Sequence, residues 1–144
     1  MKNLQTLLDL YRQDTRTTSI VQALKNETPA RVKLLELVGA QLSFVIAGVY
    51  HQHPANHLIV ADNKEEAAYW QNDLAALFGE KRVHFFPDSF KQPLRFDELN
   101  QTNVLERTET INAVSNAGRG QLIVTYPEAL FERVVSPEVL SKSR

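Results

Sequence analysis

Residues 34–50 read LLELVGAQLSFVIAGVY, and the turn inside this stretch decides how the fold is interpreted. An apolar run precedes the turn at Gly39, and an apolar segment of helical length follows it. In nucleotide-binding proteins, a strand, a glycine-containing turn and a helix in this order form the phosphate-binding loop. This loop has no lysine, so the stretch predicts either an ordinary turn or a P-loop that has lost its chemistry.

The loop departs from the P-loop pattern GxxxxGK[ST] at the positions that contact phosphate. Glu36 stands at the first glycine, Gln41 at the second and Leu42 at the lysine. Only an inner glycine, Gly39, and the hydroxyl of Ser43 remain. A carboxylate at position 36 opposes polyphosphate by on the order of 1 kcal/mol per contact, even near water. We interpret these five residues as a vestigial Walker A position that does not bind ATP, and we predict no catalytic, cofactor-binding or metal-binding residue.

The rest of the chain alternates short apolar runs with longer helical patterns. The runs predicted to be strands are Val32–Leu37, Leu58–Ala61, Val83–Phe86 and Leu122–Thr125. The helical faces between the last three runs consist of Ala67, Trp70, Leu74, Leu77 and Phe78, and of Val104, Leu105, Thr108, Ile111 and Val114. Strands joined by helical crossovers form parallel sheets. The expected fold class is therefore α/β, a parallel sheet with helices on both faces, and the vestigial loop makes it a degenerate P-loop NTPase subdomain.

Polar residues mark the expected helix starts. Asp62 with Glu65, and Thr125 with Glu128, are predicted capping boxes, in which a side chain at the helix start accepts from a backbone amide of the first turn. Ser136, followed by a proline and a glutamate, predicts the start of a last helix with proline at its first position.

The amino-terminal region has a different pattern from the rest. Apolar residues at positions i, i+3, i+4 and i+7 predict two short amphipathic helices in the first 26 residues, separated by a turn at Asp14–Thr18. Pro29 disfavours helix at the residue before it, and the pattern changes there. We therefore expect an amino-terminal helical extension, residues 1–28, and a motor-derived subdomain, residues 29–144, that is the front portion of a longer protein.

Composition excludes several functional classes. The chain has 144 residues, a formal net charge of -1 and no cysteine. The near-neutral charge gives no overall attraction for nucleic acid. The absence of cysteine excludes disulfides and thiolate zinc sites, and it is typical of a reducing compartment. No stretch approaches the roughly 20 apolar residues of a membrane span, and no signal peptide is visible. A cytoplasmic location without membrane contact is expected.

Four stretches resemble one known family when taken in order. They are LLELVGAQLSFVIAGVY, HLIVADNKEEAAYWQNDL, HFFPDSFKQPLRFDELNQTNVLERTETINAV and QLIVTYPEALFERVV, and together they span residues 30–135 without large gaps. This set resembles the first motor-like subdomain of the transcription-repair coupling factor family, Mfd. That region is itself similar to the amino-terminal part of the excision-repair protein UvrB.

The resemblance implies a role in transcription-coupled nucleotide-excision repair. As a whole, the family is an ATP-dependent, helicase-like DNA translocase that displaces stalled RNA polymerase and recruits UvrA. ATP and magnesium belong to its downstream motor, and RNA polymerase and double-stranded DNA are expected partners of the whole protein. Most UvrA contacts of the family lie in the subdomain that follows. This chain is therefore expected to be a non-catalytic UvrB-like module without a cofactor of its own.

Two further segments match the family pattern. Residues 62–64, Asp-Asn-Lys, stand at a motif that contacts nucleic acid in active motors. Phe86–Phe90 together with Pro93 matches the segment that leads, in UvrB, to a tyrosine-rich hairpin that probes damaged DNA. The short interval between Asp88 and Asn103 contains no tyrosine and leaves no room for that hairpin, so damage probing is not transferred.

The remaining polar clusters are interpreted as solvated surface. The histidines His51, His53 and His57 lie in a polar linker, and the acidic pair Asp97-Glu98 lies in a loop. The cations form at most a modest basic edge, made of Lys81, Arg82, Lys91, Arg95 and Arg107. Two other functions stay open: a small nucleotide-binding P-loop enzyme with an atypical loop, and a free-standing protein-interaction domain.

Overall fold

The computed structural model describes residues 2–90, 98–116 and 120–134. The chain divides into two compact units, Met1–Ala55 and Asn56–Arg144, and each is described by itself. The expected boundary after residue 28 falls inside the first unit, between its second and third helices. None of the helices in the described ranges is long and apolar enough to cross a membrane.

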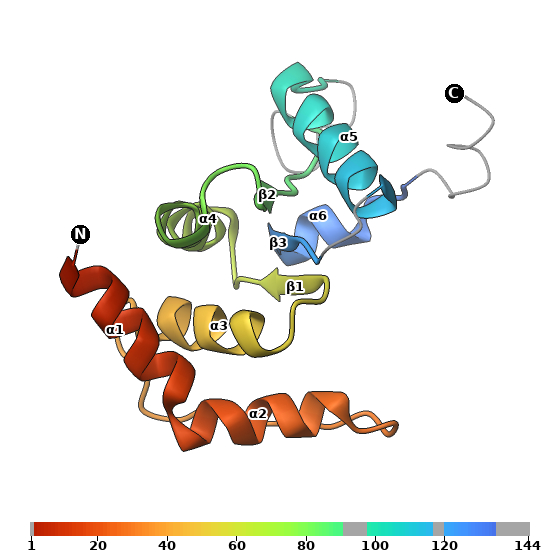
Figure 1. Cartoon of the computed structure of the whole chain (residues 1–144). Coiled ribbons are helices and arrows are strands. Elements are labelled where there is room, and N and C mark those ends of the chain that lie inside the picture. The colour runs from red at the N-terminus through yellow and green to blue at the C-terminus, as the bar shows by residue number, and fades with distance from the viewer. Residues whose placement is uncertain (1, 91–97, 117–119, 135–144) are drawn as a thin grey trace. The chain divides into compact units, whose positions relative to one another are not determined.

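The first unit consists of three helices, α1 (Lys2–Gln13), α2 (Thr15–Lys25) and α3 (Gln41–Gln52) (Figure 1). Helix α1 crosses α3 closely at Gly48, where an added Cβ would lie 3.0 Å from the carbonyl oxygen of Tyr11. The Tyr11 ring also stacks on Phe44, with 5.3 Å between centroids. Gln52 donates from Nε2 to the carbonyl oxygen of Arg12 at 2.7 Å. The missing side chain at Gly48 therefore permits the close packing of the two helices.

Helix α2 begins directly after α1, so the predicted turn over Asp14–Thr18 is wrong. Asp14 alone separates the helices, with an extended backbone at φ -62° and ψ 132°. Its Oδ1 accepts a hydrogen bond from the backbone amide of Arg16 at 2.8 Å, and its Oδ2 accepts from the Arg16 guanidinium at 2.7 Å. An aspartate in this position satisfies an amide that the first helical turn leaves unpaired.

The strand predicted over Val32–Leu37 is not formed. Within the described ranges the sheet consists of three strands, all from the second unit, and residues 26–40 are irregular. Five large apolar side chains of this segment are exposed, namely Val32, Leu34, Leu35, Leu37 and Val38. An apolar run signals a tendency to be buried, but a strand also needs a neighbour to pair with, and the first unit has no strand in its described residues.

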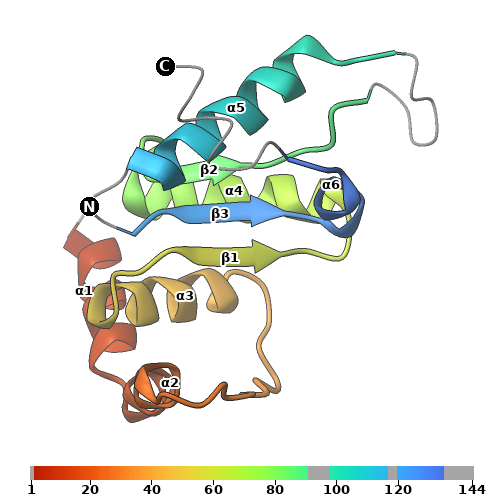
Figure 2. The same ribbon diagram turned by 90° about the vertical axis from the view of Figure 1, so that its right-hand side faces the viewer.

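The second unit is an α/β domain around a parallel sheet. Its strands are β1 (His57–Val60), β2 (Val83–Phe85) and β3 (Leu122–Thr125), and its helices are α4 (Lys64–Phe78), α5 (Gln101–Asn116) and α6 (Pro127–Phe131). The strand order is β1-β3-β2, and both pairings are parallel. Helices α4 and α5 lie on opposite faces of the sheet (Figures 1 and 2). The predicted parallel sheet with helices on both faces is confirmed.

Strand β3 forms the centre of this unit. Leu122, Val124 and Thr125 are fully buried, and Leu74 of α4 is equally inaccessible. A central strand of a parallel sheet is covered on both faces, so it appears in the sequence as an uninterrupted apolar run. This explains why LIVT was recognisable as a strand from its residues alone.

The helix starts of the second unit differ from the predicted capping boxes. The cap of α4 is Asn63, whose side-chain oxygen accepts from the amide of Glu66 at 2.9 Å, while Glu66 accepts from the amide of Asp62. Thr125 caps nothing, because its hydroxyl donates to the carbonyl oxygen of Phe86 at 2.8 Å. The first box is therefore displaced by one residue and the second is wrong. The start expected at Ser136 lies outside the described residues.

Helix α5 buries a different face from the predicted one. Leu105 is 56% exposed, and Val104 and Val114 are also exposed. The buried positions are polar, Asn103, Arg107 and Thr110. The interpretation of Arg107 as part of a solvated basic edge is therefore wrong, and the apolar side of α5 is left partly uncovered.

Candidate functional site

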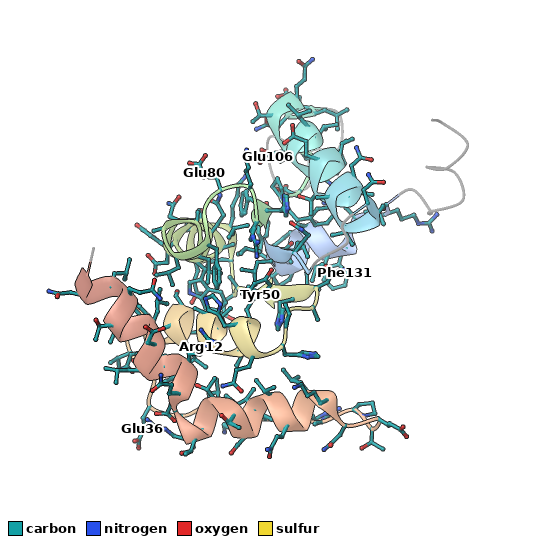
Figure 3. All side chains as sticks on the ribbon, viewed as in Figure 1. Arg12, Glu36, Tyr50, Glu80, Glu106 and Phe131 are labelled. Atoms are coloured by element: carbon teal, nitrogen blue, oxygen red, sulfur yellow. The ribbon has the colours of Figure 1, made fainter. Side chains whose placement is uncertain are left out.

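The five residues predicted to be a vestigial Walker A position lie at the end of the irregular segment and in the first turn of α3, within the first unit. Glu36 is exposed, as Figure 3 shows, and has a φ of 61°, the one positive value among the described residues other than glycine. Gly39 follows with a φ of 53°. Two left-handed residues three positions apart turn the chain into α3, and only the second is the glycine that this conformation favours.

The amides at this turn are partly used by the loop itself. Gln41, the first residue of α3, accepts at Oε1 from the amide of Val38 at 3.0 Å. The amide of Gln41 in turn donates to the carbonyl oxygen of Val38 at 3.2 Å. A P-loop instead directs its amides at phosphate oxygens. The side chain of Gln41, which stands at the predicted second-glycine position, therefore forms a hydrogen bond within the turn.

The last two positions of the predicted motif are less exposed than Glu36. Ser43 is 4% exposed, and Leu42 is half-buried. A magnesium-binding hydroxyl has to reach solvent and substrate. Leu42 carries no charge for a phosphate and the Ser43 side chain is buried, so the exposed charge at the turn is the carboxylate of Glu36.

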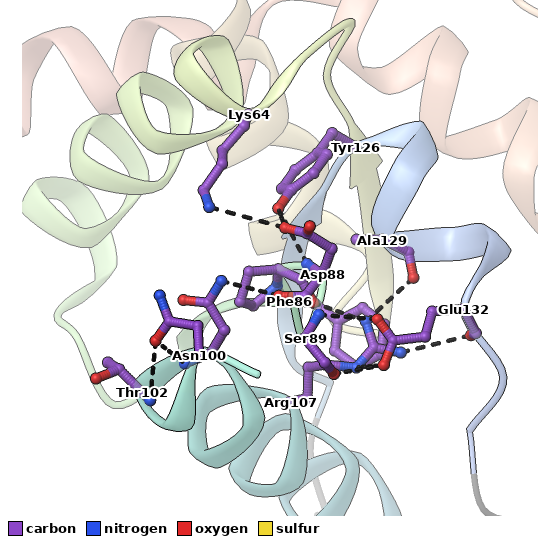
Figure 4. A network of polar contacts seen from close by, with 12 residues as sticks. Lys64, Phe86, Asp88, Ser89, Asn100, Thr102, Arg107, Tyr126, Ala129 and Glu132 are labelled. Carbon is purple, nitrogen blue, oxygen red and sulfur yellow. Dashed lines mark hydrogen bonds and ion pairs between the residues drawn. The ribbon is translucent and has the colours of Figure 1, made fainter. Parts of the chain in front are cut away.

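A second candidate site lies in the second unit, at the carboxyl ends of β2 and β3. Ligands of open α/β sheets commonly bind at this edge. Figure 4 shows that Lys64, Asp88 and Tyr126 converge there from three segments of the chain. The Tyr126 hydroxyl donates to Asp88 Oδ1 in a short hydrogen bond and accepts from the Asp88 amide at 3.0 Å. Lys64 Nζ lies 3.7 Å from the same carboxylate.

Arg107 joins this cluster from α5 and clamps the two loops together. Its guanidinium donates to the carbonyl oxygens of Pro87 at 2.6 Å and Ala129 at 3.1 Å. It also lies 4.0 Å above the ring of Phe86 and forms an ion pair with Glu132, Nε to Oε1, at 3.6 Å. Burial lowers the pKa of Arg107 and the Glu132 carboxylate opposes that shift; an arginine remains protonated in either case.

The loop after β2 is held by three further hydrogen bonds. Ser89 donates from its amide to Glu132 Oε2 at 2.8 Å, and its hydroxyl donates to Glu132 Oε1 in a short hydrogen bond. Asn103 donates from Nδ2 to the carbonyl oxygen of Asp88 at 2.8 Å. The loops after β2 and β3 are thus tied to one another and to α5.

The chemistry of the cluster favours a structural role. Burial raises the pKa of the Tyr126 hydroxyl, and its hydrogen bond to Asp88 raises it further, so the group stays protonated and acts as a donor. In the part of the chain that the structure describes, every buried side-chain nitrogen and oxygen has a hydrogen-bond partner. The buried side chains of Tyr126, Ser89 and Arg107 are thus paired within the fold.

The hollow next to this cluster has a volume of about 290 Å³ and a predominantly acidic lining. Its charged residues are Lys64, Glu65, Asp88 and Glu128. Three carboxylates against one ammonium group oppose a phosphate ligand. Lys64, which the sequence placed at a nucleic-acid contact motif, is directed at Asp88.

The other candidates do not assemble into a site. Among residues 2–90, 98–116 and 120–134, no group of three histidine, aspartate or glutamate side chains is arranged to hold a metal ion. His84 pairs with Gln121, Nε2 to Oε1, at 2.7 Å. Phe90 forms an isolated antiparallel bridge with Leu99. Pro93 and Asp97 lie outside the described residues.

In comparisons with known proteins, no family model, no curated protein and no solved structure matches the chain.

Sequence reasoning missed the pairings of the cluster, since they join residues far apart in the chain. The one local signal is the spacing of Asn103, Arg107 and Thr110 at i, i+4 and i+7, which places three polar groups on one helical face. A polar stripe of this kind is ordinarily solvated. It becomes buried here because the strand-end loops offer it carbonyl oxygens and a carboxylate.

Proposed function

We propose that this chain is a non-catalytic, UvrB-like amino-terminal module of a bacterial transcription-repair coupling factor. The proposal rests on the ordered resemblance over residues 30–135, together with a parallel α/β sheet of the kind that the resemblance implies. In this role the module acts in the cytoplasm as a scaffold within a DNA translocase. Other parts of that protein then hydrolyse ATP and bind RNA polymerase and double-stranded DNA. UvrA is bound mostly by the subdomain that follows.

The observation that carries the non-catalytic part is the closed turn before α3. The Val38 amide is hydrogen-bonded by the Gln41 side chain, and the lysine position is a half-buried leucine. Glu36 adds a carboxylate at the exposed end. Each of the three features opposes nucleotide binding independently, so no single reversal restores a functional loop.

Calorimetric titration of the chain with Mg-ATP tests this assignment directly. No binding is expected at micromolar to millimolar nucleotide. The variant Leu42→Lys is expected to bind no better than the unmodified chain, because Glu36 and Gln41 still obstruct the approach of phosphate. Micromolar affinity in either protein would refute the non-catalytic reading and favour the alternative of a small P-loop enzyme with an atypical loop.

A free-standing protein-interaction domain is the second candidate, and the exposed apolar side chains of residues 32–38 favour it. The two candidates differ in what the natural reading frame encodes after Arg144. A continuation into motor motifs supports the translocase module, whereas a natural stop near this residue would contradict it.

A further inference from the structure

Strand β1 is an edge strand of the described sheet, and one side of its backbone has no partner strand. Among the described residues β1 pairs only with β3. The amides of His57 and Ala61 donate toward β3, to the carbonyl oxygens of Gln121 and Thr125, both at 2.9 Å. Successive residues of a strand direct their backbone groups to alternate sides. The N–H and C=O groups at positions 58 and 60 therefore point away from β3.

The opposite edge of the sheet is better protected. On β2 the carbonyl oxygen of Phe85 accepts a hydrogen bond from the hydroxyl of Thr110 in α5, at 3.3 Å. In the part of the chain that the structure describes, the backbone of Leu58 and Val60 has no such bond outside the ladder with β3. Strand β1 also contains neither the lysine nor the proline that commonly protects an edge strand. Its outer edge is therefore a template for another strand.

We propose that two copies of this chain associate through this edge, with β1 of one copy antiparallel to β1 of the other. The twofold axis passes between the two Ile59 residues. Leu58 of each copy then lies opposite Val60 of the other, and these residues exchange backbone hydrogen bonds as antiparallel pairs do. The same residues serve on both sides, so the contact is isologous and closes at two copies.

The sequence of β1 selects this register. A twofold axis perpendicular to a sheet keeps each face on its own side, so the axis has to pass between two copies of one residue. With Ile59 at the axis, the flanking pairs are leucine with valine. With Leu58 at the axis, Val60 lies opposite Asn56; with Val60 at the axis, Leu58 lies opposite Asp62. Apolar cross-strand pairs stabilise a sheet, so the first register is favoured.

The side chains at the joint favour a second copy over a charged partner. Leu58 and Val60 are 58% and 43% exposed, and they lie on one face of the strand. In the dimer they form one apolar group with their counterparts. Beyond the strand, Asp62 lies opposite Asn56, so no like charges meet. The interface is short, since β1 has four residues, and a weak, concentration-dependent dimer is expected. The inference does not depend on the proposed function.

Sedimentation and NMR on the unaltered chain provide the direct test. A monomer–dimer equilibrium is expected at concentrations up to about 1 mM, the range of a small interface. In a mixture of isotopically labelled and unlabelled chain, the Hα atoms of the two Ile59 residues are expected to give an NOE between copies, because opposite residues without mutual hydrogen bonds lie closest. A chain that stays monomeric, or a dimer whose NOEs join other segments, would overturn the proposal.

Two double variants at the same exposed positions test the register. Leu58→Lys/Val60→Glu places a lysine opposite a glutamate of the other copy, whereas Leu58→Lys/Val60→Lys places lysine opposite lysine. The second variant is expected to weaken dimerisation by about tenfold or more, and the first to keep it within about threefold. With Leu58 or Val60 at the axis, both variants would bring like charges together. Equal weakening by the two variants, or no weakening by either, would contradict the assignment; circular dichroism checks that both remain folded.

Discussion

Replacing Arg107 by alanine tests whether the polar cluster holds the second unit together. The Arg107 side chain is 6% exposed, and its ion-pair partner Glu132 is 22% exposed. The change removes charge-assisted hydrogen bonds to the carbonyl oxygens of Pro87 and Ala129, each worth about 1.5–3 kcal/mol. It also leaves the carboxylate of Glu132 without its cation. Breaking a buried pair from one side costs about 3–5 kcal/mol.

These contributions overlap, so we expect Arg107→Ala to lower the free energy of unfolding by about 3–5 kcal/mol in total. Arg107→Lys is expected to recover only part of the loss, because an ammonium group cannot reproduce the planar fork of donors. Urea denaturation followed by fluorescence measures the change. The single tryptophan, Trp70, lies in α4 and reports on the second unit.

Arg133→Ala is the matched control, since Arg133 follows Glu132 in the chain and is exposed. It is expected to leave the unfolding midpoint nearly unchanged. A loss below about 1 kcal/mol in Arg107→Ala, at an unchanged denaturant slope, would refute the view that this clamp stabilises the fold.

Three further predictions concern the backbone and the helix caps. Gly48→Ala is expected to destabilise the first unit by about 1–3 kcal/mol, since the new Cβ lies 3.0 Å from the Tyr11 carbonyl oxygen. Urea denaturation followed by helical circular dichroism measures the change in stability. An unchanged denaturation curve contradicts the close crossing of α1 and α3. The Arg16 side chain lowers the pKa of Asp14 from 3.8 to about 2, so the stabilisation by this cap is complete above pH 3.8 and is lost as the pH falls through 2. In an NMR titration, Arg16→Ala is expected to raise the pKa of Asp14. An unchanged pKa of Asp14 in that variant argues against the ion pair. Gly79→Ala, at φ 82° and with open space for a Cβ, is expected to cost about 1–3 kcal/mol from backbone strain alone, and equal thermal stability would contradict that.

The sheet was predictable from the residues because its strands carry their own signal. LIVA, VHFF and LIVT are apolar runs bounded by polar residues, and all three form strands within one residue of the expected bounds. Their parallel pairing followed from the length of the helical connections. Only β3 is buried along its whole length, whereas Leu58 and Val60 of β1 are exposed although that run is equally apolar.

The prediction failed where a residue depends on a distant partner. Val32–Leu37 has the composition of a strand, but no neighbour pairs with it in the described chain. Arg107 resembled a surface cation until the carbonyl oxygens of Pro87 and Ala129 were brought to it by the fold. The five positions of the predicted vestigial Walker A loop were assigned by spacing alone. The bond between Gln41 and the Val38 amide depends on side-chain placement, which spacing does not reveal.

The strand order β1-β3-β2 has a consequence for synthesis on the ribosome. Among the described residues, strands β1 and β2 pair only with β3, which is the last of the three in the chain. At about 5–20 residues per second, β1 waits roughly 3–12 s for its partner to be made. During this interval two apolar strands have no ladder, and unpaired strand edges are prone to aggregate. A premature stop before Leu122 removes both of the described ladders at once, so β1 and β2 are left without the strand that joins them.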